Sequence, residues 1–302
     1  MLVKLLLFTL ALAAPLSGAP ATLKVRLNPG INKAAIDLPL ESYVAAVLAA
    51  ESGGLHSDEA IKAMAVAIRS YALHFRGRHS AEGYDLCGTT HCQRLDFENL
   101  TPRLKALASQ TAGEVLWFDG KPVFACYSRS CGGTTESAAA VWSELGVPFL
   151  RSRTDPYCTR QTVPSWNWRA TAPEIAASLQ RSQVRVPAEL ASITVAQRTA
   201  SGRARVLLLA GGGELMRVSA SSFRFAIARA LGWKTVRSDR FEIGASGGRL
   251  TFQGSGEGHG VGLCQLGADQ MGLEGHGYRA ILAFYYPGTT LAGPPAVFPA
   301  AV

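Results

Sequence analysis

Two alanine-rich apolar stretches near the start of the chain constrain its fold more than any other feature. In residues 41–51 (ESYVAAVLAAE) apolar side chains recur at helical spacing, and alanine fills the positions between them. A Ser-Gly-Gly sequence follows, which is typical of a helix end. A second helix is predicted over about 58–76, with Ser57 as its N-cap and two acidic residues in its first turn. Glu51 is therefore predicted to lie at the junction of two helices.

The rest of the chain alternates short strand patterns with turns. Residues 22–27 alternate in polarity, and Val115–Phe118 and Pro122–Cys126 flank an Asp-Gly pair that is a strong hairpin signal. Three short strands between 193 and 218 and a hairpin between 241 and 253 follow. The predicted class is α+β: an Ala-rich helical core with antiparallel β-hairpins and a smaller β-rich sub-domain at about 185–255.

The N-terminus has the pattern of a signal peptide. Lys4 precedes the apolar run 5–14, which is too short for a membrane span, and small residues lead to a predicted cleavage after Ala21. An uncleaved N-terminal anchor is the alternative. We expect a signal peptide over 1–21, a main domain over 22–290 and a C-terminal tail over 291–302. The mature protein is expected to be exported to the periplasm, cell wall or medium, and not to be an integral membrane protein.

The charge balance restricts the class of partner. The formal net charge is +8, and only 17% of the residues are charged. A basic exported protein suits an anionic partner, such as a cell-wall polymer. The basic residues are scattered, without a Lys/Arg block, a zinc finger or an aromatic RNA-binding pattern, so nucleic acid is not an expected partner.

The helix pair carries the first candidate site. Lys62 and Arg69 are seven residues apart, so they share one helix face, and Glu51 could lie near that face. A carboxyl group in a partly apolar junction should have a raised pKa and could protonate a glycosidic oxygen. The two cations could bind an anionic or hydroxyl-rich ligand. The alternative is a glutamate at a helix end and two solvated cations.

A second candidate site lies in the loop predicted over 77–100. Cys87, His91 and Cys92 place two thiols and an imidazole within six residues, a set that suits Zn²⁺. Three protein ligands leave one position for water, substrate or a further side chain. The alternative is a set of disulfide partners beside an incidental histidine.

Two further stretches contain residues capable of chemistry. Cys131 and Cys158 could form a structural disulfide, and Tyr157 could stack on a sugar ring. The glycine-rich segment 254–262 contains His259. The simplest interpretation is a glycine-rich turn in which this histidine forms a hydrogen bond with the backbone. His259 and Cys264 could form a base and nucleophile pair, but the sequence shows no evident residue that would orient the histidine.

Taken together, these stretches resemble the SpoIID/LytB family. The motifs that match it run in order from about residue 38 to 290: LPLESYVAAVLAAES, EAIKAMAVAIRSYAL, SRSCGGTTESAAAVW, DPYC, GEGHGVGLCQLGA and YYPGT. The sequence departs from the family pattern at Ser52-Gly53, where the family has Met-Pro, and at Glu257, where the family often has Trp.

The resemblance implies a lytic transglycosylase that cleaves MurNAc–GlcNAc bonds of glycan strands, preferably strands stripped of stem peptides, to 1,6-anhydro products. It places the acid/base on Glu51. Zinc binding in some members falls here on Cys87, His91 and Cys92. The predicted substrate-binding residues are Lys62, Arg69, Tyr157, His259 and Gln265.

Two other functions remain open at this point. Related proteins are known as amidase enhancers, so the chain could bind wall glycan without cleaving it and stimulate an N-acetylmuramoyl-L-alanine amidase. A zinc hydrolase that uses Cys87, His91 and Cys92 is the other alternative.

Overall fold

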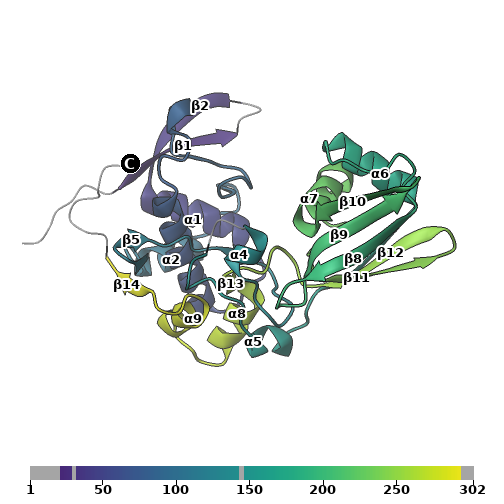
Figure 1. Cartoon of the computed structure of the whole chain (residues 1–302). Coiled ribbons are helices and arrows are strands. Elements are labelled where there is room, and N and C mark those ends of the chain that lie inside the picture. The colour runs from purple at the N-terminus through teal and green to yellow at the C-terminus, as the bar shows by residue number, and fades with distance from the viewer. Residues whose placement is uncertain (1–20, 29–31, 143–145, 294–302) are drawn as a thin grey trace, which may run out of the picture.

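A computed structural model describes residues 21–28, 32–142 and 146–293 of the 302-residue chain. Within these ranges helices and small sheets are mixed, which confirms the predicted α+β class. Figure 1 shows two bodies side by side, one built from both ends of the chain and one from its middle. The predicted signal peptide, apart from Ala21, and the tail after Gly293 lie outside the described residues.

The first body is built around two buried helices, α1 (Leu40–Glu51) and α2 (Asp58–His74), which pack against each other. Their alanines are mostly buried, and such small side chains let two helices approach closely. Ser57 caps α2 as predicted, because its hydroxyl accepts the Ala60 N–H at 3.4 Å. The helix ends at His74, two residues before the predicted end.

Elements from distant parts of the chain complete this body. Helices from both halves of the sequence pack on α2: α3 (Pro102–Gln110), α8 (Gln265–Leu273) and α9 (Tyr278–Tyr285). The shorter helices are α4 (Ala138–Val141), α5 (Pro156–Arg160), which packs on α8, and the 3-10 turn Ser80–Glu82. The N-terminal and C-terminal segments therefore share one hydrophobic core.

A small sheet ties the long loop to the start of the chain. Strands β1 (Thr22–Asn28) and β2 (Asn32–Pro39) are antiparallel, with Leu23 opposite Leu38. Strand β3 (Leu86–Cys87) pairs in parallel with β1. The stretch 77–100, predicted as a loop throughout, is thus anchored at β3.

The predicted hairpin at the Asp-Gly pair is present. Strands β4 (Val115–Phe118) and β5 (Lys121–Pro122) are joined by Asp119 and Gly120, both with positive φ as a type I′ turn requires. The second strand ends at Pro122, well short of the predicted Cys126. On the other side, β14 (Thr290–Ala292) pairs with β4, so the predicted tail from 291 begins inside a strand.

The middle of the first body holds two very short parallel strands, β6 (Tyr127–Ser128) and β13 (Leu263–Cys264). The glycine-rich segment leads into β13, and Gly256, Gly258, Gly260 and Gly262 all have positive φ. A Cβ at Gly262 would lie 2.0 Å from the Cys126 carbonyl oxygen. Glycine at this position lets the segment approach β6 closely enough to pair with it.

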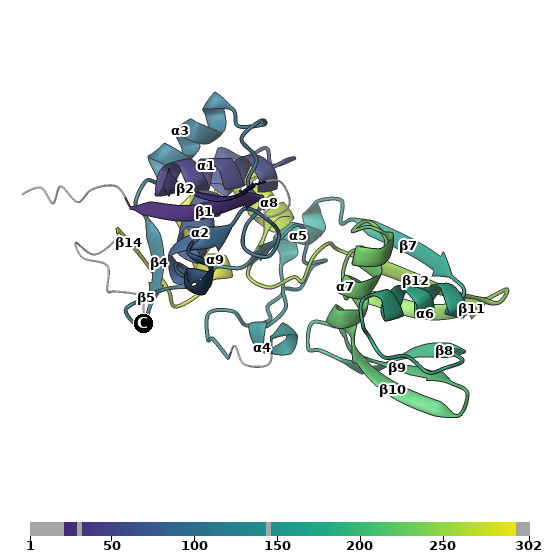
Figure 2. The same ribbon diagram turned by 90° about the horizontal axis from the view of Figure 1, so that it is seen from above.

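The second body consists of two three-stranded antiparallel sheets and two helices. The sheets are β10–β9–β8 and β11–β12–β7, formed by β7 (Ser165–Ala170), β8 (Ser192–Arg198), β9 (Ala204–Gly211), β10 (Glu214–Ser219), β11 (Phe241–Ser246) and β12 (Arg249–Ser255). The helices are α6 (Ala172–Arg181) and α7 (Ala220–Leu231). Figures 1 and 2 show them side by side along the sheets.

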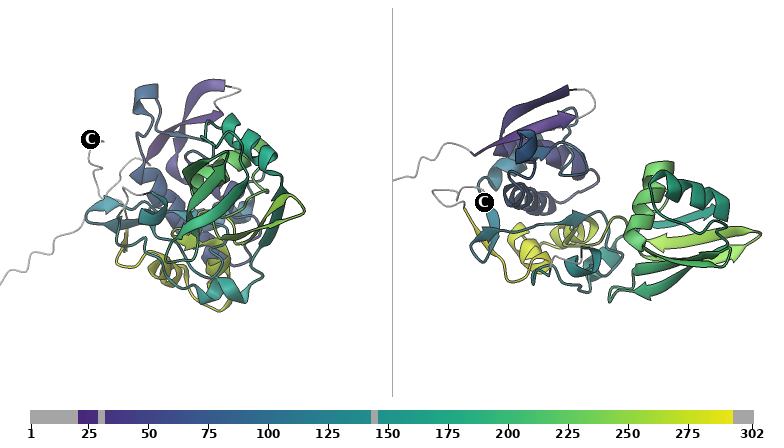
Figure 3. Two further views of the ribbon diagram at one scale, coloured as in Figure 1. Left: turned by 45° about the vertical axis from the view of Figure 1, so that its right-hand side comes forward. Right: turned by 45° about the horizontal axis from the view of Figure 1, so that its top comes forward.

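The second body has its own hydrophobic core, drawn from residues between Trp166 and Phe252. It therefore begins earlier than 185, because β7 pairs with β12 and brings its side chains into this core. The division into a domain and a β-rich sub-domain stays a prediction. Figures 2 and 3 show that the two bodies meet on one side of the first body, near α5. At this junction Arg203 donates to the carbonyl oxygens of Cys131 and Thr134.

Arg69 requires a correction, because it was predicted to bind substrate. Its side chain is completely buried in α2. The guanidinium group donates to both carboxylate oxygens of Glu41, at 2.9 and 2.6 Å, and to the Glu114 carbonyl at 2.9 Å. A guanidinium group so engaged and shielded from solvent is not positioned to contact a glycan. Arg69 instead fixes the start of α1 to α2.

Replacing Arg69 by Met should lower the free energy of unfolding by ~3 kcal/mol or more, because the Glu41 carboxylate and buried carbonyl oxygens lose their donors. Urea unfolding followed by circular dichroism measures the change. Arg205, which is exposed on β9, supplies the matched control, and Arg205→Met should alter stability by less than ~0.5 kcal/mol. If Arg69→Met kept its stability but lost glycan binding, Arg69 would instead be assigned to substrate binding.

Candidate active site and metal centre

Glu51 is the last residue of α1, at the edge of the first body's core. Residues 43–48 of the helix are buried, whereas its last turn, including the side chain of Glu51, is partly exposed. Burial raises the pKa of its carboxyl group above the ordinary value, and the Arg94 guanidinium opposes this in part. The environment favours the protonated carboxyl without sealing it from a ligand, as a general acid requires.

Two arginines bind the C-terminal end of the α1 segment. Arg94 donates to the Ala50 carbonyl oxygen at 2.5 Å, and Arg129 donates to the Gly53 carbonyl oxygen at 3.0 Å. Cations are favourable here because the last carbonyl groups of a helix carry partial negative charge. Gly54 has φ +81°, and a Cβ there would lie 2.9 Å from the Arg129 guanidinium. The two carbonyl groups that these arginines contact therefore flank Glu51 in the sequence.

A chain of two hydrogen bonds holds the hydroxyl of Tyr127, whose pKa is affected by the charge of Glu51. The Tyr43 hydroxyl donates to Gln93 Oε1 at 3.1 Å, and Gln93 Nε2 donates to the Tyr127 hydroxyl at 3.1 Å. Burial raises the pKa of Tyr127, and the negative charge of Glu51 raises it further. The Tyr127 hydroxyl accepts from Gln93, so its own proton can be donated elsewhere.

Tyr127, Gln93, Arg94 and Arg129 were missed as site residues by sequence reasoning. Arg129 lies in the quoted SRSCGG motif, and Gln93 and Arg94 directly follow the predicted metal ligand Cys92. The SRSCGG motif and the positions directly after Cys92 were the features of the sequence that could have identified these residues. The neighbourhood of Glu51 arises only when β6 and the loop after Cys92 fold against α1.

Two of the predicted substrate-binding residues are engaged away from Glu51. Lys62 forms an ion pair with Glu59, and its ammonium group lies 5.5 Å from the centre of the Tyr278 ring on α9. Tyr157 packs edge to face against Phe284, also on α9. The structure therefore does not bring Lys62 or Tyr157 together with Glu51, and their binding roles stay predictions.

His259 and Gln265 lie on the segments that cover β6. The Leu266 N–H donates to the Arg129 carbonyl oxygen at 3.2 Å, so Gln265, buried at the start of α8, lies beside the strand that carries Tyr127. The Val261 N–H donates to His259 Nδ1 at 3.0 Å. Burial lowers the pKa of His259 to about 3, so its imidazole is neutral and carries its proton on Nε2.

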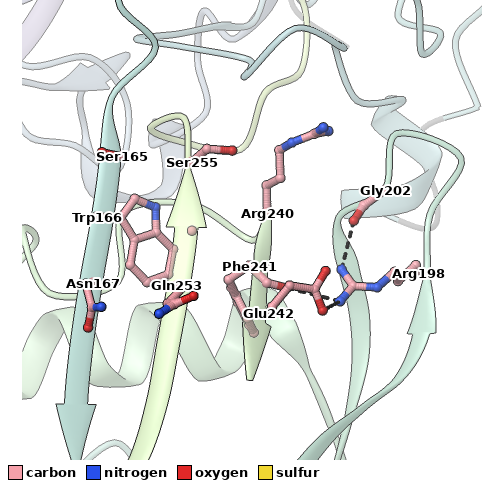
Figure 4. Close-up of a pocket in the computed structure, with 11 residues that line it drawn as sticks. Ser165, Trp166, Asn167, Arg198, Gly202, Arg240, Phe241, Glu242, Gln253 and Ser255 are labelled. Carbon is pink, nitrogen blue, oxygen red and sulfur yellow. Dashed lines mark hydrogen bonds and ion pairs between the residues drawn. The ribbon is translucent and has the colours of Figure 1, made fainter. Parts of the chain in front are cut away.

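A separate pocket with a volume of about 780 Å³ lies on the second body, and Figure 4 shows residues that line it. It is lined by polar residues together with Trp166 and Phe241, mostly on β7, β11 and β12, and Arg198 on β8 pairs there with Glu242. The predicted site residues are not part of its lining. This pocket is distinct from the neighbourhood of Glu51.

The predicted metal ligands are joined by a fourth residue, His79. The ligand atoms of His79, Cys87, His91 and Cys92, here called the His79 cluster, all lie within 4.8 Å of one another. Cys92 Sγ lies 3.4 Å from His79 Nε2 and 3.6 Å from His91 Nδ1, and Cys87 Sγ lies 3.7 Å from His91 Nδ1. Such spacings suit a tetrahedral zinc ion, whose ligand atoms are roughly 3.3–3.8 Å apart.

A second layer of contacts orients His79. Its Nδ1 lies 2.6 Å from Glu82 Oε1, and the Tyr84 hydroxyl donates to Glu82 Oε2 at 2.9 Å. The hydrogen bond from His79 is the largest cause that lowers the pKa of Glu82. A carboxylate that takes the Nδ1 proton leaves the Nε2 lone pair for a metal, which is the usual arrangement of metal-binding histidines.

The donor set of the His79 cluster fits Zn²⁺ and would close its coordination. Four protein ligands would fill a tetrahedron around zinc, so His79 could take the position that the sequence leaves open. A closed set is typical of structural zinc and gives no support to a zinc hydrolase. Because Gln93 and Arg94 directly follow Cys92, an ion here would hold the loop that supplies both residues to the Glu51 neighbourhood.

Comparison with known proteins identifies the family. A family model described as "Stage II sporulation protein", SpoIID, matches residues 30–118. An uncharacterized protein of Brachyspira hyodysenteriae is 31% identical over 257 residues, which cover 84% of this chain and 67% of that protein. The chain belongs to the SpoIID family. The region matched by the family model contains Glu51 and the whole His79 cluster.

Two relatives from Bacillus subtilis carry functional names. Stage II sporulation protein D is 26% identical over 297 residues, which cover 93% of this chain and 81% of that protein. The amidase enhancer is 28% identical over 275 residues, which cover 78% of this chain but only 38% of the enhancer. Among the described helices of the present chain, none has the length and apolar character needed to span a bilayer.

Replacing His79 by Ala should remove one bound zinc ion per chain, because the His79 cluster then has only three of the four ligands that a structural zinc site needs. Glu82→Gln should keep the ion but weaken its binding roughly 10–100-fold, because the carboxylate no longer orients His79. Zinc content after dialysis against a graded chelator series, measured by plasma mass spectrometry, gives both results. His276→Ala is the control, because His276 lies outside the cluster. Wild-type zinc affinity in His79→Ala would contradict the four-ligand assignment.

Proposed function

We propose that this chain is a lytic transglycosylase that cleaves the bond between MurNAc and GlcNAc in peptidoglycan glycan strands, with Glu51 as its acid/base. The single observation that carries the proposal is the position of Glu51: a carboxyl group with a raised pKa at a partly exposed helix end. The names of the SpoIID relatives support a role connected with the cell wall. The basic charge of the chain suits such an anionic polymer.

In the first step the protonated Glu51 donates its proton to the glycosidic oxygen. The bond from that oxygen to C1 of MurNAc breaks, GlcNAc leaves with a new hydroxyl group, and C1 takes on oxocarbenium character. In the second step the Glu51 carboxylate accepts the proton of the MurNAc C6 hydroxyl, whose oxygen attacks C1. The 1,6-anhydro ring closes and Glu51 returns to its protonated form.

One carboxyl group is sufficient for this route because the nucleophile belongs to the substrate. A hydrolase would need a second carboxylate to serve as the nucleophile or to activate water. The described neighbours of Glu51 instead offer donors. The Tyr127 hydroxyl, held by Gln93, could donate to a sugar oxygen or to the ionised Glu51, and the Arg94 and Arg129 guanidinium groups could bind the lactyl carboxylate of MurNAc.

The second candidate function is non-catalytic stimulation of an amidase. It is favoured by the relative named amidase enhancer, of which this chain covers 38%. In that case the same surface would bind glycan and an N-acetylmuramoyl-L-alanine amidase would do the cleavage. The two functions differ in one outcome. Only a transglycosylase produces 1,6-anhydro ends when the purified chain is incubated with glycan strands and no amidase.

Glu51→Gln should abolish 1,6-anhydro product on peptide-free glycan strands, with a loss of at least about 100-fold in rate, since the general acid and base are removed together. Mass spectrometry of the released saccharides measures the product. Glu98→Gln is the matched control, because Glu98 is exposed in the loop after the metal cluster. Because burial disfavours the ionised Glu51, the melting temperature of Glu51→Gln at neutral pH should equal or exceed that of the wild type. Full activity of this variant would end the assignment.

The pH dependence of cleavage should report the raised pKa of Glu51. The acid form is required first, so kcat/KM should fall as pH rises through the pKa of Glu51 in the free protein. Arg94 lowers this pKa, so Arg94→Met should raise it and move the descending limb to higher pH. The measurement is the pH at which kcat/KM falls to half its maximum, compared between the wild type and Arg94→Met. A limb that stays in place, or moves to lower pH, would contradict the role of Glu51 as acid.

A further inference from the structure

A second group of potential metal ligands is buried in the first body, apart from the His79 cluster. The ligand atoms of Cys131, Asp155, Cys158 and Cys264, here called the Cys131 cluster, all lie within 4.8 Å of one another. All four residues are completely buried. The cluster is not used in the proposed cleavage, so it needs an account of its own.

The four residues come from three separate segments. Cys131 follows β6, Asp155 and Cys158 stand at the start of α5, and Cys264 ends β13 and caps α8. More than 100 residues separate Cys158 from Cys264 along the chain. The fold therefore converges on this point, although the sequence shows no compact ligand motif.

The geometry suits a tetrahedral zinc ion better than a disulfide. Ligand atoms around zinc, with Zn–S bonds of about 2.3 Å, are roughly 3.5–3.8 Å apart. Cys131 Sγ lies 3.2 Å from Asp155 Oδ2, slightly closer than this range, and all three sulfurs fall within the cluster's 4.8 Å limit. All three are free thiols, so the predicted Cys131–Cys158 disulfide is not formed. A disulfide would use two sulfurs and leave a third thiol and a carboxylate buried beside it.

The groups around the cluster favour negatively charged ligands. The Cys131 and Gly267 N–H groups point at Cys264 Sγ, at 3.2 and 3.4 Å, and the Ser130 hydroxyl lies 3.5 Å from Cys158 Sγ. Donors directed at sulfur stabilise thiolates, as do the outer contacts of known metal sites. The buried guanidinium of Arg203 donates to the Cys131 carbonyl oxygen at 2.6 Å and adds positive charge.

Asp155 gives the second reason to expect a cation. Among the described residues, the hydrogen bonds to its carboxylate come from neutral groups: the Cys158 N–H at 3.0 Å, the Tyr285 hydroxyl at 2.9 Å and the Cys131 thiol. A buried carboxylate without a counter-charge is costly, and a divalent cation would supply that charge.

We propose that Cys131, Asp155, Cys158 and Cys264 bind a second zinc ion through three sulfurs and one carboxylate oxygen. The site is structural, because four protein ligands fill the tetrahedron and the residues are sealed from solvent. The ion joins β6, α5 and β13 directly. It thereby fixes the strand that carries Tyr127, and through Cys131 it fixes the junction with the second body at Arg203.

The test is the number of zinc ions bound by the full chain, purified without chelator and measured by native mass spectrometry. The unaltered protein should bind two, Cys92→Ser should bind one, Cys264→Ser should bind one, and the double variant should bind none. Cys126→Ser is the matched control, since Cys126 is buried but belongs to neither cluster, and it should bind two. A single zinc ion in the unaltered protein that Cys92→Ser removes would overturn the proposal.

A second measurement does not depend on the folding of Cys264→Ser. In the Cys92→Ser protein, X-ray absorption at the zinc edge should show three sulfur ligands and one oxygen. Alkylation of the unaltered protein after denaturation without reductant should modify Cys131, Cys158 and Cys264. A disulfide between any two of them, or a zinc shell with nitrogen in place of this sulfur set, would contradict the site.

Discussion

The close packing of α1 on α2 is the constraint on which the rest of the structure depends. Alanine at the contact positions lets the helices approach, and the buried pair Arg69–Glu41 fixes their relative position. The end of α1 then falls at the edge of the core, where Glu51 is shielded enough to raise its pKa but stays partly exposed. The helix packing thus sets the place of the carboxyl group, and its burial together with the opposing charge of Arg94 sets its acidity.

Regular secondary structure is sparse around Glu51. Strands β3, β6 and β13 are two residues long, so few ladder hydrogen bonds hold the segments that supply Gln93, Arg94 and Tyr127. The two ligand clusters lie on these same segments, at Cys87–Cys92 and at Cys131 with Cys264. Metal coordination would give short loops the rigidity that longer strands give elsewhere, which the proposed positioning of Tyr127 and the arginines requires.

Lys62 and Arg69 show where reasoning from spacing succeeds and fails. Their separation of seven residues places them on one face of α2, as the helical repeat dictates. The periodicity does not say what covers that face. In the structure α1 and α3 pack against α2 at Arg69, whereas α9 lies at Lys62, so both cations contact protein groups. His79 shows the converse, because its place beside Cys92 follows from the fold of the loop and not from a motif.

The sequence by itself determined the two helices, the position of Glu51 at the end of the first, the turn of the Asp-Gly hairpin, the strand segments between 193 and 253, and the grouping of Cys87, His91 and Cys92. These features depend on contacts between residues close along the chain, which propensity and periodicity describe. Only the tertiary structure decided the burial of Arg69, the place of His79 beside Cys87, His91 and Cys92, the Tyr43–Gln93–Tyr127 chain and the Cys131 cluster. These features depend on how segments pack in space, from 13 residues apart for His79 and Cys92 to more than 130 for β6 and β13, and local propensity does not specify which segments will meet.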